Sequence, residues 1–185
     1  MFGGVSEKRT LGQIAKFGPQ NGFYRKGAEV DGDIPIIKMK ELFAGDEICN
    51  TESIDKVALT ADEMNRFSLS EDDLLFGRRS LVPEGAGKCV RISASCGKII
   101  FESSILRMRI DSSVVQPLFV QYWFKTPQGE SEMSKIRSGT TIIGIKGSDL
   151  KNVQIPVPSL DLQNAFIAFF NQADKSGFIN SNRGL

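Results

Sequence analysis

The stretch SGTTIIGIKGSDLKNVQIPVPSLDLQNAF, from Ser138 to Phe166, decides most of the architecture of this chain. It runs from a polar glycine turn into a short apolar strand, passes two closely spaced prolines and enters an amphipathic helix. Ser159 stands where a helix N-cap is expected. The apolar stripe of that helix comprises Leu162, Phe166, Phe169, Phe170 and Ala173. Such a stripe is predicted to be buried, either against the rest of this chain or against a partner.

Upstream of this stretch, the first two-thirds of the chain favour strands. LGQIAKF reads as a short strand or turn, and IPIIKMKEL reads as one buried strand. TADEMNRF predicts a short helix, because Thr60 and Glu63 fit a capping box. Further strands are predicted in LLFGRRS, with a bend at Gly77, and in CVRISA, GKII and ESSILRMRID.

The remainder mixes short helices with short strands. PLFVQYWFKT and GESEMSKIR predict helices, whereas TIIGIK and NVQIPV predict strands. The overall fold class predicted from these patterns is α+β.

Composition narrows the possible chemistry. The 185 residues suit one substantial domain, and they include no histidine. This absence excludes histidine-based triads and, with only Cys49, Cys89 and Cys96 available, a four-ligand zinc site of nitrogen and sulfur. The cysteines form no CxxC pair, which is typical of a reducing cytoplasm. The opening MFGGVSEKRTLG predicts no signal peptide, and AFIAFF is far too short for a membrane span.

Charge is distributed unevenly along the chain although the net charge is only +1. Residues 41–75 carry ten acidic side chains against Lys56 and Arg66, whereas residues 76–98 carry five basic side chains against Glu84. A polyanion-binding face needs such local clustering more than a high overall pI, but an ordinary mosaic surface gives the same pattern.

Two short motifs suggest catalysis, and neither is complete. GAGK at 85–88 resembles the end of a phosphate loop, but Val82 and Cys89 stand where glycine and Ser or Thr are required, so a turn is the better interpretation. Asp149-Leu150-Lys151, with Glu132 upstream, has the form of a metal-dependent nuclease motif, although Asp149 also suits a turn.

The pair Arg78-Arg79 is a stronger candidate for binding. Adjacent strand residues point to opposite faces, so only one of the two can enter the core, and the other should face solvent or a ligand. A guanidinium fork can grip phosphate or guanine, but it can also pair with the acids of SEDD nearby.

The order of these motifs resembles the target-recognition domain of specificity subunits in type I restriction–modification systems. The matching segments, over residues 9–176, are LGQIAKF, DIPIIKMKEL, TADEMNRFSLSEDDLLFGRRSLV, PLFVQYWFK and RSGTTIIGIKGSDLKNVQIPVPSLDLQ, with Leu160 and Gln163 at family positions in the last. The resemblance implies a recognition domain over residues 1–158, the start of a spacer helix over 159–176 and a flexible tail over 177–185. Because one such domain is present and the helix breaks at Gly177, the chain resembles a half-subunit, a truncated product or a fragment.

The resemblance implies recognition of duplex DNA without catalysis, in the cytoplasm. The partners it implies are methyltransferase subunits, through them the restriction subunit, and a second half-subunit. No cofactor is expected on this chain, since S-adenosylmethionine and ATP belong to those partner subunits. The candidate DNA-contacting residues are Arg25, Lys26, Lys38, Lys40, Arg78, Arg79, Thr140, Thr141 and Lys146. The candidate partner-binding residues are Phe166, Phe169 and Phe170.

Two hypotheses from other classes stay open at this point. In one, the phenylalanine-rich helix and the acidic segment 41–75 form a protein-interaction module that binds no DNA. In the other, Asp149 belongs to a small metal-dependent nuclease.

Overall fold

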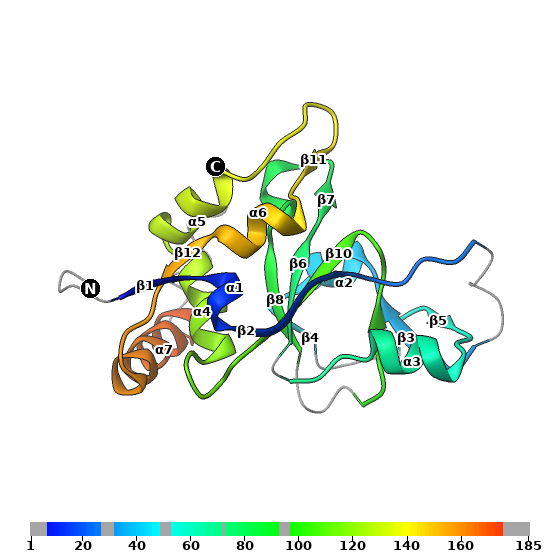
Figure 1. Cartoon of the computed structure of the whole chain (residues 1–185), viewed down its shortest axis with the longest axis horizontal. Helices are drawn as coiled ribbons and strands as arrows, with labels where there is room; N and C mark the ends of the chain where they lie inside the picture. Colours follow the sequence, from blue (N-terminus) through cyan, green and yellow to red (C-terminus); the bar gives the residue numbers. More distant parts are fainter. Residues whose placement is uncertain (1–6, 27–31, 49–52, 72, 93–96, 176–185) are drawn as a thin grey trace.

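A computed structural model describes residues 7–26, 32–48, 53–71, 73–92 and 97–175 (Figure 1). Its centre is a sheet with strand order β2-β10-β6-β8-β4. All neighbours in this sheet are antiparallel except β4 and β8. Its strands are β2 (Ala15–Asn21), β4 (Glu47–Ile48), β6 (Asp73–Gly77), β8 (Cys89–Ile92) and β10 (Ile105–Ile110).

The central sheet is buried on both faces, as the alternation along β10 shows. Leu106, Met108 and Ile110 belong to the larger hydrophobic core, whereas Ile105 belongs to a second core on the opposite face. Strand β6 alternates in the same way and is buried at every position. Along β10 the residues that follow Ile105 on its face are Arg107 and Arg109, so the strand alternates between an apolar face and a face with two arginines.

Helices cover the face of the sheet that bears the larger core, on the left of Figure 1. They are α1 (Leu11–Ile14), α4 (Pro117–Phe124), α5 (Pro127–Ser134), α6 (Gly147–Asn152) and α7 (Leu160–Lys175). Phe119 of α4 and Phe166 of α7 meet edge to face, with ring centroids 5.2 Å apart. None of the helices within the described ranges combines the length and the apolar character needed to cross a bilayer.

A smaller lobe lies at the opposite end of the molecule, on the right of Figure 1. It contains a three-stranded sheet of order β5-β3-β9. Its elements are α3 (Ala61–Phe67), β3 (Ile34–Ile37), β5 (Lys56–Val57) and β9 (Ile100–Phe101), whereas α2 (Met39–Ala44) lies near the centre of Figure 1, where Leu42 joins the second core of the central sheet. Phe23 packs edge to face on Phe67, with centroids 5.7 Å apart, in a third small core.

Two further strand pairs and one turn of 3-10 helix complete the fold. Strand β1 (Lys8–Thr10) pairs with β12 (Gln154–Pro156), so a segment near the start of the described chain meets one just before α7. Strand β7 (Arg79–Ser80) pairs with β11 (Ile143–Gly144) in a narrow ribbon at the top of Figure 1, and η1 (Pro83–Gly85) follows β7.

Much of the secondary structure predicted from the sequence is confirmed, including the α+β class. Helix α3 has the predicted capping box, in which Thr60 and Glu63 bond reciprocally. Helix α4 and strands β8 and β10 lie within the segments predicted to form them, whereas α5 begins two residues and β6 one residue before its predicted segment. Cys49 and Cys96 lie outside the described residues, and Cys89 is buried in the larger core.

Three of the sequence predictions are wrong about local structure. LGQIAKF begins with helix α1, because Thr10 and Gln13 form a capping box that the strand interpretation overlooked. IPIIKMKEL is not one strand: β3 ends at Ile37 and α2 follows, with the Glu41 carboxylate accepting from the Lys38 N–H. The segment around Asp149 is not a turn but helix α6.

The stripe predicted on the last helix is only partly buried. Phe166 is buried and Phe170 stacks on Tyr122 at 5.0 Å, yet Leu162 and Phe169 are about half exposed. On the same helix the polar residue Gln163 is fully buried. Its side-chain amide donates to the Pro158 carbonyl and accepts from the Gln116 N–H. The predicted break at Gly177 lies outside the described residues.

Candidate nucleic-acid interface

The narrow ribbon β7/β11 brings together five of the nine residues predicted to contact DNA. Its register pairs Ser80 with Ile143 and Arg79 with Gly144. Beyond β11 the chain is tied to Arg78, whose carbonyl accepts from Ile145 N at 3.0 Å. Thr140 and Thr141 are exposed in the loop before β11, and Lys146 is exposed just after it, at the N-cap of α6.

The loop that carries the threonines is closed by its own backbone. Ser138 and Gly144 exchange two hydrogen bonds of 2.9 and 2.8 Å, which hold the ends of the loop together. Gly139 has φ +109, a region that L side chains rarely adopt, and a Cβ there would lie 2.1 Å from the Ile142 carbonyl oxygen. The glycine therefore fixes the path of the loop.

Arg78 is the inward member of the arginine pair, although its partners are not the acids of SEDD. Its guanidinium donates to Asn21 Oδ1 and to the Ser103 carbonyl, each at 3.0 Å. Burial, followed by repulsion from the neighbouring Arg79, lowers the pKa of Arg78 from its ordinary value. Arg78 thus ties β2 and the turn before β10 to the ribbon, while it stays half-buried.

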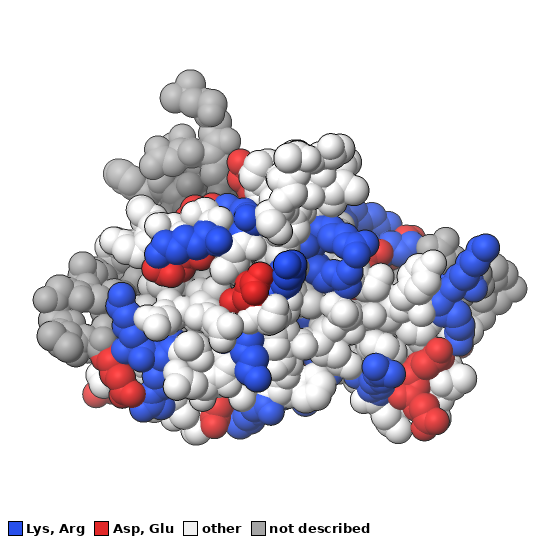
Figure 2. Space-filling view, turned by 45° about the horizontal axis from the view of Figure 1, so that its top comes forward, with Lys and Arg blue, Asp and Glu red and all other residues white. Residues whose placement is uncertain are grey.

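Arg79 and Lys146 carry charges that no acidic side chain neutralises within the part of the chain that the structure describes. Both side chains are exposed, and neither has a hydrogen bond or ion pair with any residue in the described ranges 7–26, 32–48, 53–71, 73–92 and 97–175. Figure 2 shows Lys and Arg side chains gathered beside a white projection at the upper centre of the molecule, where the loop before β11 stands out. The ribbon thus has exposed basic residues, Arg79 and Lys146, along its strands and an uncharged loop at its end.

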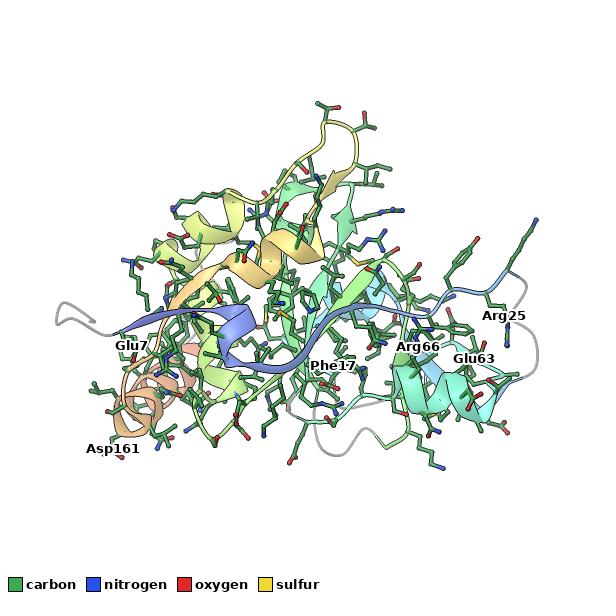
Figure 3. All side chains as sticks on the ribbon, in the orientation of Figure 1. Glu7, Phe17, Arg25, Glu63, Arg66 and Asp161 are labelled. Carbon is green, nitrogen blue, oxygen red and sulfur yellow. The ribbon has the colours of Figure 1, made fainter. Side chains whose placement is uncertain are left out.

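The other four predicted residues lie elsewhere, and acidic neighbours engage three of them. Arg25, at the right-hand end of Figure 3, donates to both carboxylate oxygens of Glu63 at 3.0 Å. Lys38 and Lys40 both contact the Asp55 carboxylate, at 3.1 and 3.2 Å. Their hydrogen bonds hold the pKa of Asp55 below its ordinary value. Lys26 is exposed beside Arg25.

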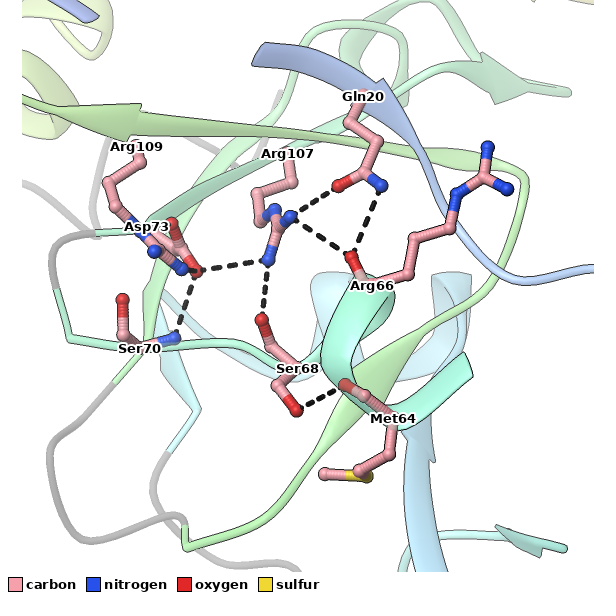
Figure 4. Close-up of polar contacts among 8 residues, drawn as sticks. All are labelled: Gln20, Met64, Arg66, Ser68, Ser70, Asp73, Arg107 and Arg109. Atoms are coloured by element: carbon pink, nitrogen blue, oxygen red, sulfur yellow. Dashed lines mark hydrogen bonds and ion pairs between the residues drawn. The ribbon is translucent and has the colours of Figure 1, made fainter. Parts of the chain in front are cut away.

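The sequence analysis missed a buried network of charges between the sheet and the smaller lobe (Figure 4). Asp73 is fully buried and accepts two hydrogen bonds from Arg109 at 2.8 and 2.9 Å. Arg107 lies 3.7 Å from the same carboxylate and donates to the carbonyls of Ser68 and Arg66 at the end of α3. The sequence did contain a signal for this network. Arg107 and Arg109 alternate along the strand predicted in ESSILRMRID, and buried arginines require an acidic partner, which Asp73 provides on the neighbouring strand β6.

The sequence analysis also missed two exposed apolar residues on the ribbon. Leu81 is 79% exposed and Ile142 is 55% exposed, and both border the position of Arg79. The two aliphatic side chains thus share one small exposed area with Arg79.

The nuclease motif does not gather into a metal site. The described residues contain no group of three acidic, cysteine or histidine side chains placed to hold a metal ion. The Asp149 carboxylate accepts from Ser148 Oγ, and Glu132 pairs with Lys135 at 2.7 Å. These two acids are therefore engaged separately, each with its own neighbour.

Residues 5–183 match the model of the type I restriction modification DNA specificity domain, and the chain belongs to this family. The specificity subunit of the type I restriction enzyme EcoKI of Escherichia coli K12 is 23% identical over 146 residues, which are 78% of this chain and 31% of that subunit.

Solved structures of the family share the fold over nearly the whole chain. The HsdS subunit from Thermoanaerobacter tengcongensis gives a TM-score of 0.63 at 17% identity over 96% of this chain. The S subunit from M. genitalium gives 0.58 at 16% identity over 95%. A chain from work on complex assembly and conformational transition of the type I R-M system gives 0.66 at 14% identity over 96%. This chain spans 40% of each of those chains.

Proposed function

We propose that this chain reads one part of a duplex DNA target for a type I restriction–modification complex. The observation that carries the proposal is the β7/β11 ribbon, where Arg79 and Lys146 are exposed and have no acidic partner among the described residues, in a chain of the DNA specificity family. Arg25, Lys38 and Lys40 are second in rank, because each already contacts a carboxylate. Lys26 ranks with them because of its place beside Arg25.

In recognition of this kind, contacts to phosphates position the duplex and contacts to base edges determine the sequence. Lys146, with the backbone N–H groups of the loop before β11, is suited to phosphate contacts that position the duplex. Arg79, Thr140 and Thr141 are suited to base edges in a groove, since a guanidinium can bond guanine O6 and N7 together and hydroxyls can bond any base. Arg78 supports this arrangement from behind through Asn21 and Ser103.

In this proposal residues 1–158 are the recognition unit and residues 159–176 begin a spacer helix. The exposed side chains Leu162 and Phe169 form the outer face of α7, and Phe166 and Phe170 attach the helix to α4. The outer face is suited to a helix of a methyltransferase subunit or of a second recognition unit. Of the three phenylalanines predicted to bind partners, Phe169 is therefore the one to propose as a direct contact.

The chain carries out no reaction of its own in this proposal. Methylation and cleavage belong to partner subunits in the cytoplasm, and the EcoKI relative is itself called a specificity subunit of a restriction enzyme. The restriction subunit is reached through the methyltransferase subunits, so its contact with this chain is indirect.

Selection from a random duplex pool tests the proposal. The purified chain is expected to enrich one short, fixed sequence that survives moderate salt. Arg79→Ala should lower the enrichment, whereas Arg9→Ala should not, because Arg9 pairs with Glu7 far from the ribbon in Figure 3. Salt-sensitive binding without enrichment would show that the chain contacts phosphates but does not recognise a sequence. No binding at any salt would favour the protein-interaction hypothesis.

A further inference from the structure

The outer face of the β7/β11 ribbon carries side chains that the fold does not use. Ser80 and Ile143 lie opposite each other and face inwards, where Ser80 is buried and Ile143 packs against the larger core. Because side chains alternate along a strand, the residues on either side of this pair face outwards. On one side these are Leu81 and Ile142, and on the other Arg79 and Gly144.

The outward side chains border a shallow hollow of about 430 Å³, here called the ribbon hollow. Leu81, Ile142 and Arg79 line it from the ribbon, and Met39 and Phe43 line it from α2. Its surface is mostly aliphatic or aromatic, with one guanidinium at the edge. Phe43 is 46% exposed, so the ribbon hollow is open to a partner.

The loop before β11 holds Ile142 in place before any partner arrives. The hydrogen bonds between Ser138 and Gly144 close the loop, and the constrained backbone of Gly139 lies directly against the Ile142 carbonyl. Gly144 has no side chain opposite Arg79, which leaves the guanidinium free to extend across the ribbon. A preorganised apolar tip loses little conformational entropy on binding.

The charges on the ribbon and its width indicate which kind of partner binds to its outer face. Arg79 borders the apolar residues and Lys146 follows β11, and neither side chain has an ion pair with an acid in the part of the chain that the structure describes. An anionic partner is therefore favoured over a neutral apolar one. Two strands lie about 4.8 Å apart, and the major groove of B-DNA, about 12 Å wide, admits such a two-stranded ribbon.

We infer that the β7/β11 ribbon enters the major groove and that Ile142 and Leu81 recognise a thymine there by its 5-methyl group. Thymine is the natural base that presents a methyl group in the major groove, and aliphatic side chains are the groups that contact it. Arg79, at the edge of the ribbon hollow, is placed to bond an adjacent guanine or phosphate. The inference rests on the proposed function and assigns the element and the base that this function uses.

Removal of the methyl group from the DNA tests the inference directly. The duplex enriched by the wild-type chain is remade with deoxyuridine in place of each thymidine in turn, and affinity is measured for each. At one or two positions the change should weaken binding about fourfold, the value of one buried methyl-sized group. Ile142→Ala should bind the thymidine duplex about fourfold less tightly than wild type and no longer distinguish it from the deoxyuridine duplex.

Leu160→Ala is the matched control, because Leu160 is also an exposed aliphatic residue, at 44%, but lies at the start of α7. It should keep the wild-type ratio between the two duplexes. If wild type enriches a sequence but tolerates deoxyuridine everywhere, or if Ile142→Ala keeps the wild-type ratio, the inference is overturned while the proposed function stands. If wild type enriches no sequence, both fall together.

Discussion

Arg78 and Arg79 are neighbours in the chain, yet their side chains occupy different environments. The guanidinium of Arg78 donates to Asn21 and to the Ser103 carbonyl, so it contributes to the fold. The side chain of Arg79 extends from the ribbon into solvent at the edge of the ribbon hollow. Substitution of Arg78 should therefore mainly lower the stability of the fold, whereas substitution of Arg79 should mainly lower the affinity for DNA.

Arg79→Ala is expected to weaken duplex binding by about 1–3 kcal/mol if Arg79 reads a base, with the free energy of unfolding within about 0.5 kcal/mol of wild type. Arg78→Ala should lower the free energy of unfolding by about 1–3 kcal/mol, because it leaves Asn21 and Ser103 without their charged donor. Urea denaturation and a binding titration measure the two effects. Unchanged binding in both single variants and in the double variant would remove both arginines from the interface.

Asp73 has a different importance, since it joins two arginines of β10 in the interior. Its carboxylate accepts from Arg109 and from the Ser70 N–H, and Arg107 lies close by. The Arg107 guanidinium also lies 4.9 Å from the centre of the Phe17 ring. Its contacts with the end of α3 attach the smaller lobe to the central sheet.

Asp73→Asn is expected to lower the free energy of unfolding by about 3–5 kcal/mol, because it leaves two arginines without the buried charge that compensates them. Urea denaturation followed by circular dichroism measures the change. The control is Glu132→Gln, which removes an exposed pair with Lys135 and should cost less than about 1 kcal/mol. Equal effects of the two substitutions would contradict the structural importance given to Asp73.

Among the elements, the loop before β11 depends most on one glycine. Gly139→Ala is expected to lower the free energy of unfolding by about 1–3 kcal/mol and to weaken DNA binding, because φ +109 and the close Ile142 carbonyl force the loop to move. Gly97→Ala is the matched control: Gly97 also has a positive φ, of +64, but nothing lies within 4 Å of an added Cβ. Thermal unfolding and a binding titration of both variants decide the matter, and a smaller loss for Gly139→Ala would contradict it.

Helix α3 is stabilised by a carboxylate at its start, and this contribution depends on pH. The Thr60 N–H donates to Glu63 and is the largest influence holding the pKa of Glu63 below its ordinary value of 4.5; Arg25 adds to it. A depressed pKa in the folded state means that the stabilisation is fully present above the unfolded-state pKa and is lost as pH falls through the folded-state pKa.

Glu63→Gln is therefore expected to flatten the dependence of stability on pH below about pH 5, since glutamine can still accept the capping bond but does not titrate. The free energy of unfolding of wild type and variant, measured from pH 7 down to pH 3, gives the comparison. Parallel curves for the two proteins would show that Glu63 does not contribute to acid sensitivity.

The sequence predicted secondary structure best where a single element is determined by a short local pattern. The caps of α3, the proline-initiated helix α4 and the alternation of β10 are local signals, and each was predicted correctly. The division of IPIIKMKEL into β3 and α2 depends on Glu102, whose carboxylate accepts from the Met39 N–H 63 positions away. A contact of that sequence separation cannot be inferred from local propensity.

At the scale of the whole molecule, the unpaired cations determine how binding responds to salt. The logarithm of the affinity should fall linearly with the logarithm of salt concentration, by about 0.9 for each phosphate neutralised. Lys146→Ala should reduce this slope by about 1 and weaken binding to all sequences similarly. Arg9→Ala should leave the slope unchanged, and a wild-type slope near zero would contradict a phosphate-binding surface.

The candidate site could be predicted from the sequence only in part. The arginine pair and the polar loop were recognised from residue type and order, and the structure places them together on the ribbon. Lys38 and Lys40 were chosen for the same reason, but their pairing with Asp55 depends on how the smaller lobe folds. Leu81 and Ile142 were missed because exposure is a property of the assembled fold.

The connection from the ribbon to α7 has a mechanical consequence. After β11 the chain forms α6, β12 and α7 with only short connections between them, and Leu150, Val153 and Ile155 anchor this path in the larger core. The pairing of β12 with β1 holds it from the other side. The described chain between ribbon and helix thus contains no hinge. In the proposed complex, α7 would keep a fixed direction relative to the ribbon, so the orientation of the ribbon in a groove would set the direction of anything attached to the helix.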